Sequence, residues 1–355
     1  MKLVSKHIAA VSVVASAFAG IMWSSSSMAY DPYSDPTFCS YPQHASLPQC
    51  ATTARQGTTQ IQSTQSLNLS STISSAIANS LSNRPGGQIR PTNSSGLNET
   101  GRAAAGYDDK LNVWGALGTT TMAFKYAPAQ SAGGSTLGLV GADYLFAPDM
   151  LAGAVLSVDE NRIGYNPTGV IGRADGRGYM LSPYLAWQLN RNWLLDASVG
   201  IGSADMNMRN NAAIGNTKDK RSSASVSASY VTRMGNMDLT GKASLINANN
   251  KTGAFVDSAA VLNSEVVVRT TQVRVGGQAS YGQGTLVPYA GVYYVVDTDR
   301  QIIAGAANDR DAFQVALGLN IFTKGSLSGG IMYATETGRS QIKNDQLIAN
   351  IAVRF

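Results

Sequence analysis

From about residue 111 to residue 355 the chain alternates, in short segments, between apolar side chains and small or polar ones. The last segment is the clearest, and one of its faces is wholly apolar: Leu347, Ala349, Ile351, Val353 and Phe355. Alternate residues of a β-strand point to opposite faces, whereas a helix repeats every 3.6 residues. The pattern therefore predicts strands with one apolar face.

Counting such segments predicts an even number of strands joined by connections that alternate in length. We expect about twelve, near residues 110–121, 135–147, 150–162, 176–189, 192–206, 221–233, 236–248, 268–281, 285–298, 311–322, 325–335 and 345–355. Tight turns such as 147–149 alternate with longer polar stretches at 163–175, 207–220, 249–267 and 299–310. Short turns at one end and long loops at the other are typical of an outer-membrane barrel.

The composition agrees with strands that expose every second residue to lipid. Only 14% of the 355 residues are charged and 36 are glycine, whereas soluble domains carry about 25% charged residues. Lipid offers the backbone no hydrogen-bond partner, so a spanning sheet must close on itself. A soluble β-sandwich also alternates, but its loops would not sort by length. We therefore expect an all-β transmembrane barrel of about twelve antiparallel strands.

The first 29 residues have the form of a secretory signal peptide. Lys2 and Lys6 precede an apolar stretch at 8–22, and small residues at 27–29 suit cleavage before Tyr30. A transmembrane anchor is the weaker alternative, because the stretch is shorter than the roughly 20 residues that a spanning helix needs. Removal of this peptide would leave His44 as the single histidine.

The predicted segment 30–57 contains both cysteines of the chain, Cys39 and Cys50. In an exported protein two nearby cysteines favour a disulfide. A metal site that uses Cys39, His44 and Cys50 is the alternative, but the spacing matches no familiar metal motif. We expect a disulfide-closed loop, no metal and no cofactor.

Residues 58–84 carry an apolar stripe at helical spacing, and residues 58–83 carry no charge. The stripe consists of Ile61, Leu69, Ile73, Ile77 and Leu81, set among Ser, Thr, Gln, Asn and Ala. This predicts a helix, which could lie in a narrow polar lumen without burying an ion. A marginal surface helix is the alternative, since Ser, Thr and Asn are mediocre helix formers. Residues 85–107, rich in Gly, Pro, Ser and Asn, read as a flexible linker.

Several motifs along the predicted barrel resemble the autotransporter (type V secretion) β-domain. They are NVWG at 112–115, LVGADY at 139–144, LAGA at 151–154 and GYMLSPYLAW at 178–187, with Phe355 at the end. The resemblance implies a twelve-stranded outer-membrane barrel with its N-terminal neighbour threaded through the lumen. It also implies that Phe355 serves as a signal to the outer-membrane assembly machinery. The chain departs from the family in having only about residues 30–57 to display.

The residues offer little for catalysis. A Ser-His-Asp triad needs an imidazole, and no histidine follows His44. The adjacent carboxyl groups of Asp159 and Glu160 read as solvated boundary charges. We therefore expect no catalytic residue and no enzymatic activity.

Charged residues at inward positions are the candidate functional residues. Four of them, Asp196, Lys242, Arg274 and Arg354, should line the lumen, where they would pair across it or bond the helix. Residues 218–221 are the densest basic group and read as a loop beside lipopolysaccharide. A nucleic-acid surface would need stacking aromatic residues as well.

Together these features predict a monomeric barrel in the outer membrane of a Gram-negative cell. Its expected partners are membrane lipid, lipopolysaccharide and the assembly machinery, with no nucleic acid. Its expected function is to anchor and translocate its own short N-terminal segment. A small-solute channel and an adhesin that acts through its outer loops are the alternatives.

Overall fold

A computed structural model describes residues 48–82, 110–125, 130–165, 172–281, 285–300, 309–323 and 327–354, with side chains placed at 58–77 of the first range. The predicted signal peptide, Cys39, the linker 85–107 and Phe355 lie outside the described residues. Cys50 lies in the first turn of a helix. Because Cys39 is not described, the disulfide stays a prediction.

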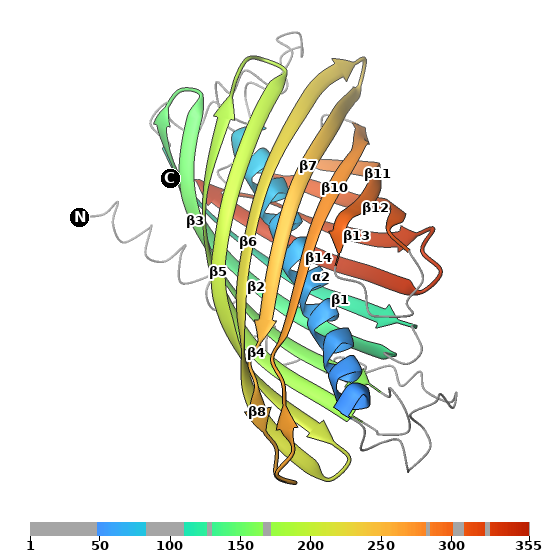
Figure 1. The fold of residues 1–355 in the computed structure, drawn as a ribbon. Coiled ribbons are helices and arrows are strands. Elements are labelled where there is room, and N and C mark those ends of the chain that lie inside the picture. The colour runs from blue at the N-terminus through green and yellow to red at the C-terminus, as the bar shows by residue number, and fades with distance from the viewer. Residues whose placement is uncertain are drawn as a thin grey trace, which may run out of the picture.

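Within the described residues, twelve antiparallel strands close into a barrel (Figure 1). They are β1 Leu111–Phe124, β2 Ser131–Ala147, β3 Met150–Tyr165, β4 Gly172–Gln188, β5 Trp193–Asn210, β6 Ala213–Met234, β7 Met237–Thr252, β10 Val266–Tyr281, β11 Leu286–Arg300, β12 Asp311–Phe322, β13 Leu327–Thr337 and β14 Ile342–Arg354. Neighbours in sequence pair throughout, and β1 pairs with β14 to close the sheet. Closure leaves no unpaired strand edge. The predicted fold class is confirmed.

The outward face of the barrel is apolar and has aromatic residues near both ends. Large apolar residues exposed on it include Leu156, Leu181, Val199, Ile201, Val226, Leu245, Val275 and Leu317. Near the short-turn end lie exposed rings of Tyr144, Phe146, Trp187, Trp193, Tyr230 and Tyr281; nearer the other end lie those of Tyr179, Tyr294, Phe313 and Tyr333. Aromatic girdles on either side of an apolar band mark the two membrane interfaces.

One predicted loop is wrong. We expected a loop at 207–220, but β5 continues to Asn210, β6 begins at Ala213, and a two-residue turn joins them. Asn211 has φ 50°, a left-handed conformation that Asn tolerates better than most residues. Residues 213–220 looked like a loop because a strand that has left the hydrocarbon core of the membrane no longer needs an apolar outward face.

The wall of the barrel is consequently uneven in height. β6 has 22 residues and β13 only 11, and the hairpin of β5 and β6, with β8 and β9 next to it, forms the lower end of the wall in Figure 1. A small pair, β8 Phe255–Val256 and β9 Leu262–Asn263, lies in the connection after β7. The ring of Phe255 covers Gly215, where an added Cβ would lie 2.1 Å from it. The connection therefore folds against β6.

The helix α2, Pro48–Ser82, lies inside the barrel (Figure 1). It packs mainly against β7 and β10, with further contacts to β1 through β6. The helix begins ten residues before the predicted start at 58, because the sequence prediction followed only the apolar stripe. Proline is well tolerated in a first helical turn, and Pro48 occupies that position. Among the described residues, no helix has the length and apolar character needed to cross a membrane.

Candidate functional site

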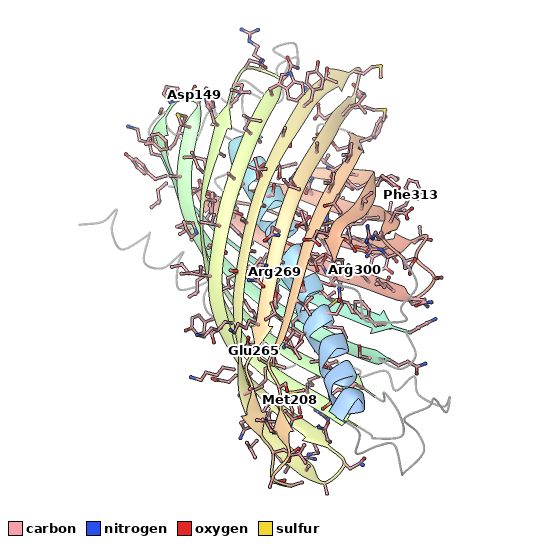
Figure 2. The ribbon with its side chains drawn as sticks, in the orientation of Figure 1. Asp149, Met208, Glu265, Arg269, Arg300 and Phe313 are labelled. Atoms are coloured by element: carbon pink, nitrogen blue, oxygen red, sulfur yellow. The ribbon has the colours of Figure 1, made fainter. Side chains whose placement is uncertain are left out.

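The contacts of α2 define its direction in the lumen. Near its N-terminal end, the Thr59 hydroxyl lies 3.1 Å from the hydroxyl of Thr252, the last residue of β7. Near its C-terminal end, Ser74 bonds Asp196, which lies three residues after the start of β5 at a short turn. Figure 2 shows the two barrel ends, with Asp149 of a short turn at the top and Met208 and Glu265 near the bottom. The N-terminal end of α2 therefore lies at the end with the tall strands.

One side of the helix packs against an apolar wall. Leu69, Ile73 and Ile77 of the predicted stripe are buried. They belong to one cluster with residues of β1 through β5 and β14: Trp114, Ala116, Leu139, Leu151, Val155, Met180, Tyr184, Ala186, Leu194 and Ile348. Burial of a large aliphatic side chain contributes about 1.5–3 kcal/mol. This contact holds the helix without fixing its height, because apolar packing has no direction.

Two inward-facing aromatic residues of that wall are held in place by hydrogen bonds. The Trp114 Nε1 donates to the Tyr184 hydroxyl at 3.1 Å, and that hydroxyl donates to Asp143 at 3.0 Å. The Tyr184 ring lies over Gly153, where an added Cβ would approach its Cζ to 2.5 Å. Glycine at this position lets the ring lie against the strand.

On the polar side, Ser74 bonds three residues of the wall. Its hydroxyl donates to Asp196 Oδ1 at 2.6 Å, receives from Lys242 Nζ at 2.7 Å and lies 3.0 Å from the Ser227 hydroxyl. Asp196 is only 2% exposed. A buried ion must be paired and hydrogen-bonded to persist, and here the helix hydroxyl links the two ions of opposite sign.

This arrangement binds the helix to the wall. Asp196 accepts the Ser74 hydroxyl proton in a hydrogen bond, and Lys242 donates to the Ser74 oxygen. Among the described residues no group of three or more His, Cys, Asp or Glu could hold a metal.

Arg274 of β10 binds the helix one to two turns nearer its N-terminus. Its guanidinium donates to Ser71 at 2.9 Å and to the Asn68 Oδ1 at 3.4 Å. The same group donates to Gln272 and Gln314 on the wall. A guanidinium has five donors in a rigid fork, which suits a residue that must satisfy wall and helix together.

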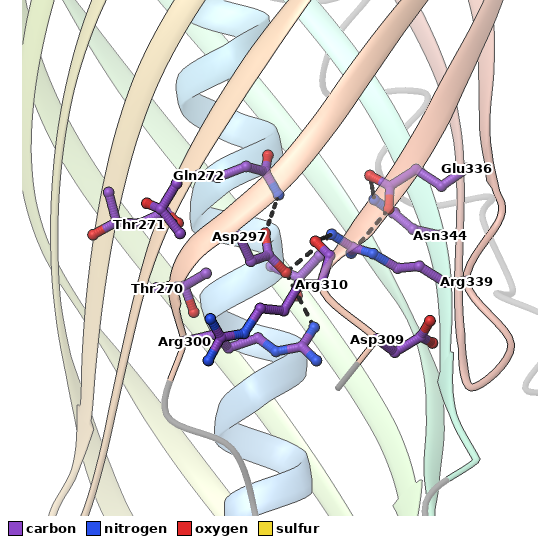
Figure 3. Close-up of polar contacts among 12 residues, drawn as sticks. Thr270, Thr271, Gln272, Asp297, Arg300, Asp309, Arg310, Glu336, Arg339 and Asn344 are labelled. Carbon is purple, nitrogen blue, oxygen red and sulfur yellow. Dashed lines mark hydrogen bonds and ion pairs between the residues drawn. The ribbon is translucent and has the colours of Figure 1, made fainter. Parts of the chain in front are cut away.

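A second ion cluster lies beside this contact, in β10 through β14 (Figure 3). Asp297 Oδ2 accepts from Arg300 at 3.0 Å and from Arg339 at 2.9 Å. Arg339 also donates to Glu336, whose other oxygen accepts from Asn344 at 2.9 Å. Asn344 and Asn68 exchange amide hydrogen bonds. The helix thus joins the cluster through a neutral amide.

A third cluster overturns our interpretation of Asp159 as a solvated boundary charge. Its side chain is only 9% exposed, and it accepts from Arg221 of β6 at 2.7 Å over Gly178 on the same wall. Arg221 also pairs with Asp219 at 2.9 Å. Asp219 accepts from Asn250, which in turn accepts from Ser66 of the helix.

The candidate residues are thus placed as follows. Asp196, Lys242 and Arg274 lie in the lumen, and their side chains form hydrogen bonds with residues of α2. Arg354 pairs with Asn112 of β1 in the sheet register, and its side chain is not among those described. The sequence analysis missed Arg221, Asp219, Asp297, Arg300, Glu336 and Arg339. Asp219 and Arg221 occupy alternate positions of β6 that face the lumen. This alternation could have identified them, but the stretch was interpreted as a loop.

All of these ions belong to the wall, and residues 58–77 of the helix carry none. In the clusters around Asp159 and Asp297 the wall charges pair with each other. Asp196, Lys242 and Arg274 form no ion pair within 4.0 Å among the described residues and bond hydroxyl and amide groups of the helix. Hydrogen bonds to charged groups each contribute about 1.5–3 kcal/mol. The fixed positions of the wall charges determine the height and rotation of the helix in the lumen. The apolar contacts on its other side do not determine either.

Known proteins of the same architecture are found by sequence and by structure. A family model, the autotransporter β-domain, matches residues 114–334. The translocator domain of the autotransporter NalP from Neisseria meningitidis is similar, with TM-score 0.59 and 14% identity over 69% of this chain and 89% of that one. So is the β-domain of the Bordetella autotransporter BrkA, with TM-score 0.57 and 12% identity over 70% of this chain and 100% of that one. No curated protein matches in sequence.

At these identities the two structures share the fold alone with this protein, but the family match stands on sequence. It spans 221 of the 355 residues, from 114 to 334, which is more than half of the chain. The chain therefore belongs to the autotransporter β-domain family.

Proposed function

We propose that this outer-membrane barrel anchors its own N-terminal segment and carries that segment to the cell surface, with α2 remaining in the lumen as a plug. The direction of α2 is the observation that carries the proposal. Short turns of outer-membrane barrels face the periplasm and longer connections face outward. The N-terminal end of α2 lies at the end that bears the thirteen-residue connection 253–265, so the residues before it are delivered outside.

The lumen contacts support a resting plug. Thr59, Ser63, Ser66, Asn68, Ser71 and Ser74 bond the wall at successive heights. A small-solute channel would require all of these bonds to break. The alternative of an adhesin has less loop to act through than expected, because strands take up much of the predicted loops 163–175 and 249–267.

Labelling of single cysteines on intact cells tests the topology. Cys39 and Cys50 are replaced by serine, and a cysteine is placed at Ala51, at Ala260 of the long connection or at Asn236 of a short turn. We expect a membrane-impermeant maleimide to label positions 51 and 260 equally and to leave 236 unlabelled until the outer membrane is ruptured. Labelling of position 51 only after rupture would refute the proposal.

A further inference from the structure

The tall wall formed by β3 through β7 has an outward surface that the lumen does not use. Beyond the apolar band, this surface carries a groove of about 1140 Å³ whose lining includes six Lys or Arg and four Asp or Glu. The groove lies outside the barrel, at the end that bears the long connections.

The sheet register shows where this surface meets the membrane. One outward row consists of Leu156, Leu181, Ile201, Ser222 and Asn249, and the next row toward the outer end consists of Val158, Tyr179, Ser203, Lys220 and Lys251. Tyr179 is 58% exposed, and an exposed tyrosine in this position marks the membrane interface. Lys220 and Lys251 lie two and three strands along this row from Tyr179. Because strands of such barrels tilt by about 35–45°, the row slants outward toward the β5–β6 tip (Figure 1), and the two lysines lie beyond the tyrosine ring, on its headgroup side.

These two lysines are directly opposite each other on neighbouring strands. Like charges in that position destabilise a sheet. Lys251 has a partner in Glu265 at 2.8 Å, but Lys220 and Lys218 have no carboxylate within 4.0 Å among the described residues. Arg173 and Arg162 at the far side of the groove do have carboxylate partners, at 2.8 and 3.1 Å. Asp205 is directly opposite Lys218 in the register, whereas Lys220 is opposite Ser203 and Lys251, so the positive charge that no carboxylate faces is that of Lys220.

The opposite, shorter wall differs at the outer girdle. There the tyrosine hydroxyls contact carboxylates, Tyr294 with Asp311 at 3.4 Å and Tyr333 with Asp345 at 3.3 Å. An anionic headgroup would be repelled by those carboxylates and attracted by the lysines of β6.

We propose that Lys218, Lys220 and Lys251 bind the phosphate groups of a phosphorylated glycolipid in the outer leaflet, whose acyl chains lie on the Leu156, Leu181 and Ile201 row. Lysine is a common phosphate ligand, and a phosphate between Lys220 and Lys251 removes their mutual repulsion. The sugar headgroup would occupy the groove, where the charged pairs of β3 and β4 offer hydrogen bonds. This binding is independent of the plug and fixes the tall wall against the leaflet.

Binding is measured on the purified full chain in non-ionic detergent, by fluorescence anisotropy of labelled, bisphosphorylated rough lipopolysaccharide. The test variant is K218Q/K220Q. The matched control is K125Q/K343Q, which removes two lysines that are also exposed at the outer ends of strands. We expect K218Q/K220Q to raise Kd at least tenfold and K125Q/K343Q to change it less than twofold. Equal Kd values for the two variants would overturn the proposal.

Two other probes identify the source of the phosphate. Phosphatidylglycerol should compete at least tenfold more weakly than the glycolipid, and inorganic phosphate at millimolar concentration should not displace it. Equal competition by phosphatidylglycerol, or displacement by inorganic phosphate, would overturn the assignment to a glycolipid. Surface labelling at position 51 should be unchanged in K218Q/K220Q, so this test and that of the plug fail separately.

Discussion

The substitution Ser74→Ala removes the hydroxyl that links Asp196 and Lys242 to the helix. It takes away three contacts at 2.6, 2.7 and 3.0 Å, two of them to charged groups. Alanine is the best helix former and serine a poorer one, so intrinsic propensity would favour the variant helix by a few tenths of a kcal/mol. Ser74→Ala should therefore loosen the helix if the lumen contacts dominate, and stabilise it if helix propensity dominates.

The size of the effect follows from the two charged contacts. Hydrogen bonds to charged groups contribute about 1.5–3 kcal/mol each, but Asp196 and Lys242 can move toward each other once the hydroxyl is gone. We take about 3 kcal/mol for the net loss in docking free energy. Since each 1.4 kcal/mol is a factor of ten, the undocked population of the helix should rise about 100-fold.

Hydrogen exchange of the amides of residues 66–77 measures that population directly. The matched control is Ser75→Ala, because the adjacent Ser75 is exposed and its hydroxyl bonds only the Ser71 carbonyl within the helix. We expect exchange in Ser74→Ala to be about 100-fold faster and in Ser75→Ala to be unchanged. Planar-bilayer recordings should show more frequent openings in the first variant alone. Equal exchange rates in the two variants would refute the proposed role of Ser74.

Three further substitutions test the barrel itself, each by the free energy of unfolding in urea from lipid vesicles. Arg221→Met leaves two buried carboxylates without their cation and should cost about 3–5 kcal/mol. Val199→Arg puts a charge on a lipid-facing position that is 56% exposed and should cost about 2–4 kcal/mol. Gly153→Ala brings a Cβ to 2.5 Å from the Ala142 carbonyl oxygen and the Tyr184 ring and should cost about 1–3 kcal/mol.

Each of these has a control of the same chemistry. Arg177→Met removes an arginine whose side chain is 83% exposed, Ile214→Arg places a charge near the tip of the β5–β6 hairpin, and Gly241→Ala adds a Cβ with nothing within 4 Å. All three should change stability by less than about 0.5 kcal/mol. If a control lowered the free energy of unfolding as much as its test variant, that result would contradict the burial or membrane position on which the prediction rests.

Period-two alternation was enough to predict the strands and their lipid-facing sides. Leu181, Val199 and Leu317 lie on the outward face because in the membrane every second residue must be apolar. The same rule failed at residues 213–220, where the outward side chains include Asn216, Lys218 and Lys220. Beyond the hydrocarbon core the outward face can be polar, so the strand lost its periodic signal and the inward ions Asp219 and Arg221 were not recognised.

For the helix, too, the sequence predicted the properties that depend on nearby residues and not those that depend on distant ones. Its apolar stripe and lack of charge predicted a helix that could lie in a lumen, since both are properties of residues one or two turns apart. Its direction in the lumen could not be deduced, because it depends on contacts with residues such as Thr252 and Asp196 that are more than 100 positions away.

The amino-acid sequence by itself thus determined a closed sheet with an apolar outer face and a neutral helix before it. Only the tertiary structure decided which lumen ions pair, where the helix sits among them, and that lysines of β6 and β7 share one row with the interfacial Tyr179. The physical reason is range: side-chain alternation is local, whereas ion pairing and strand register join residues that closure of the barrel brings together.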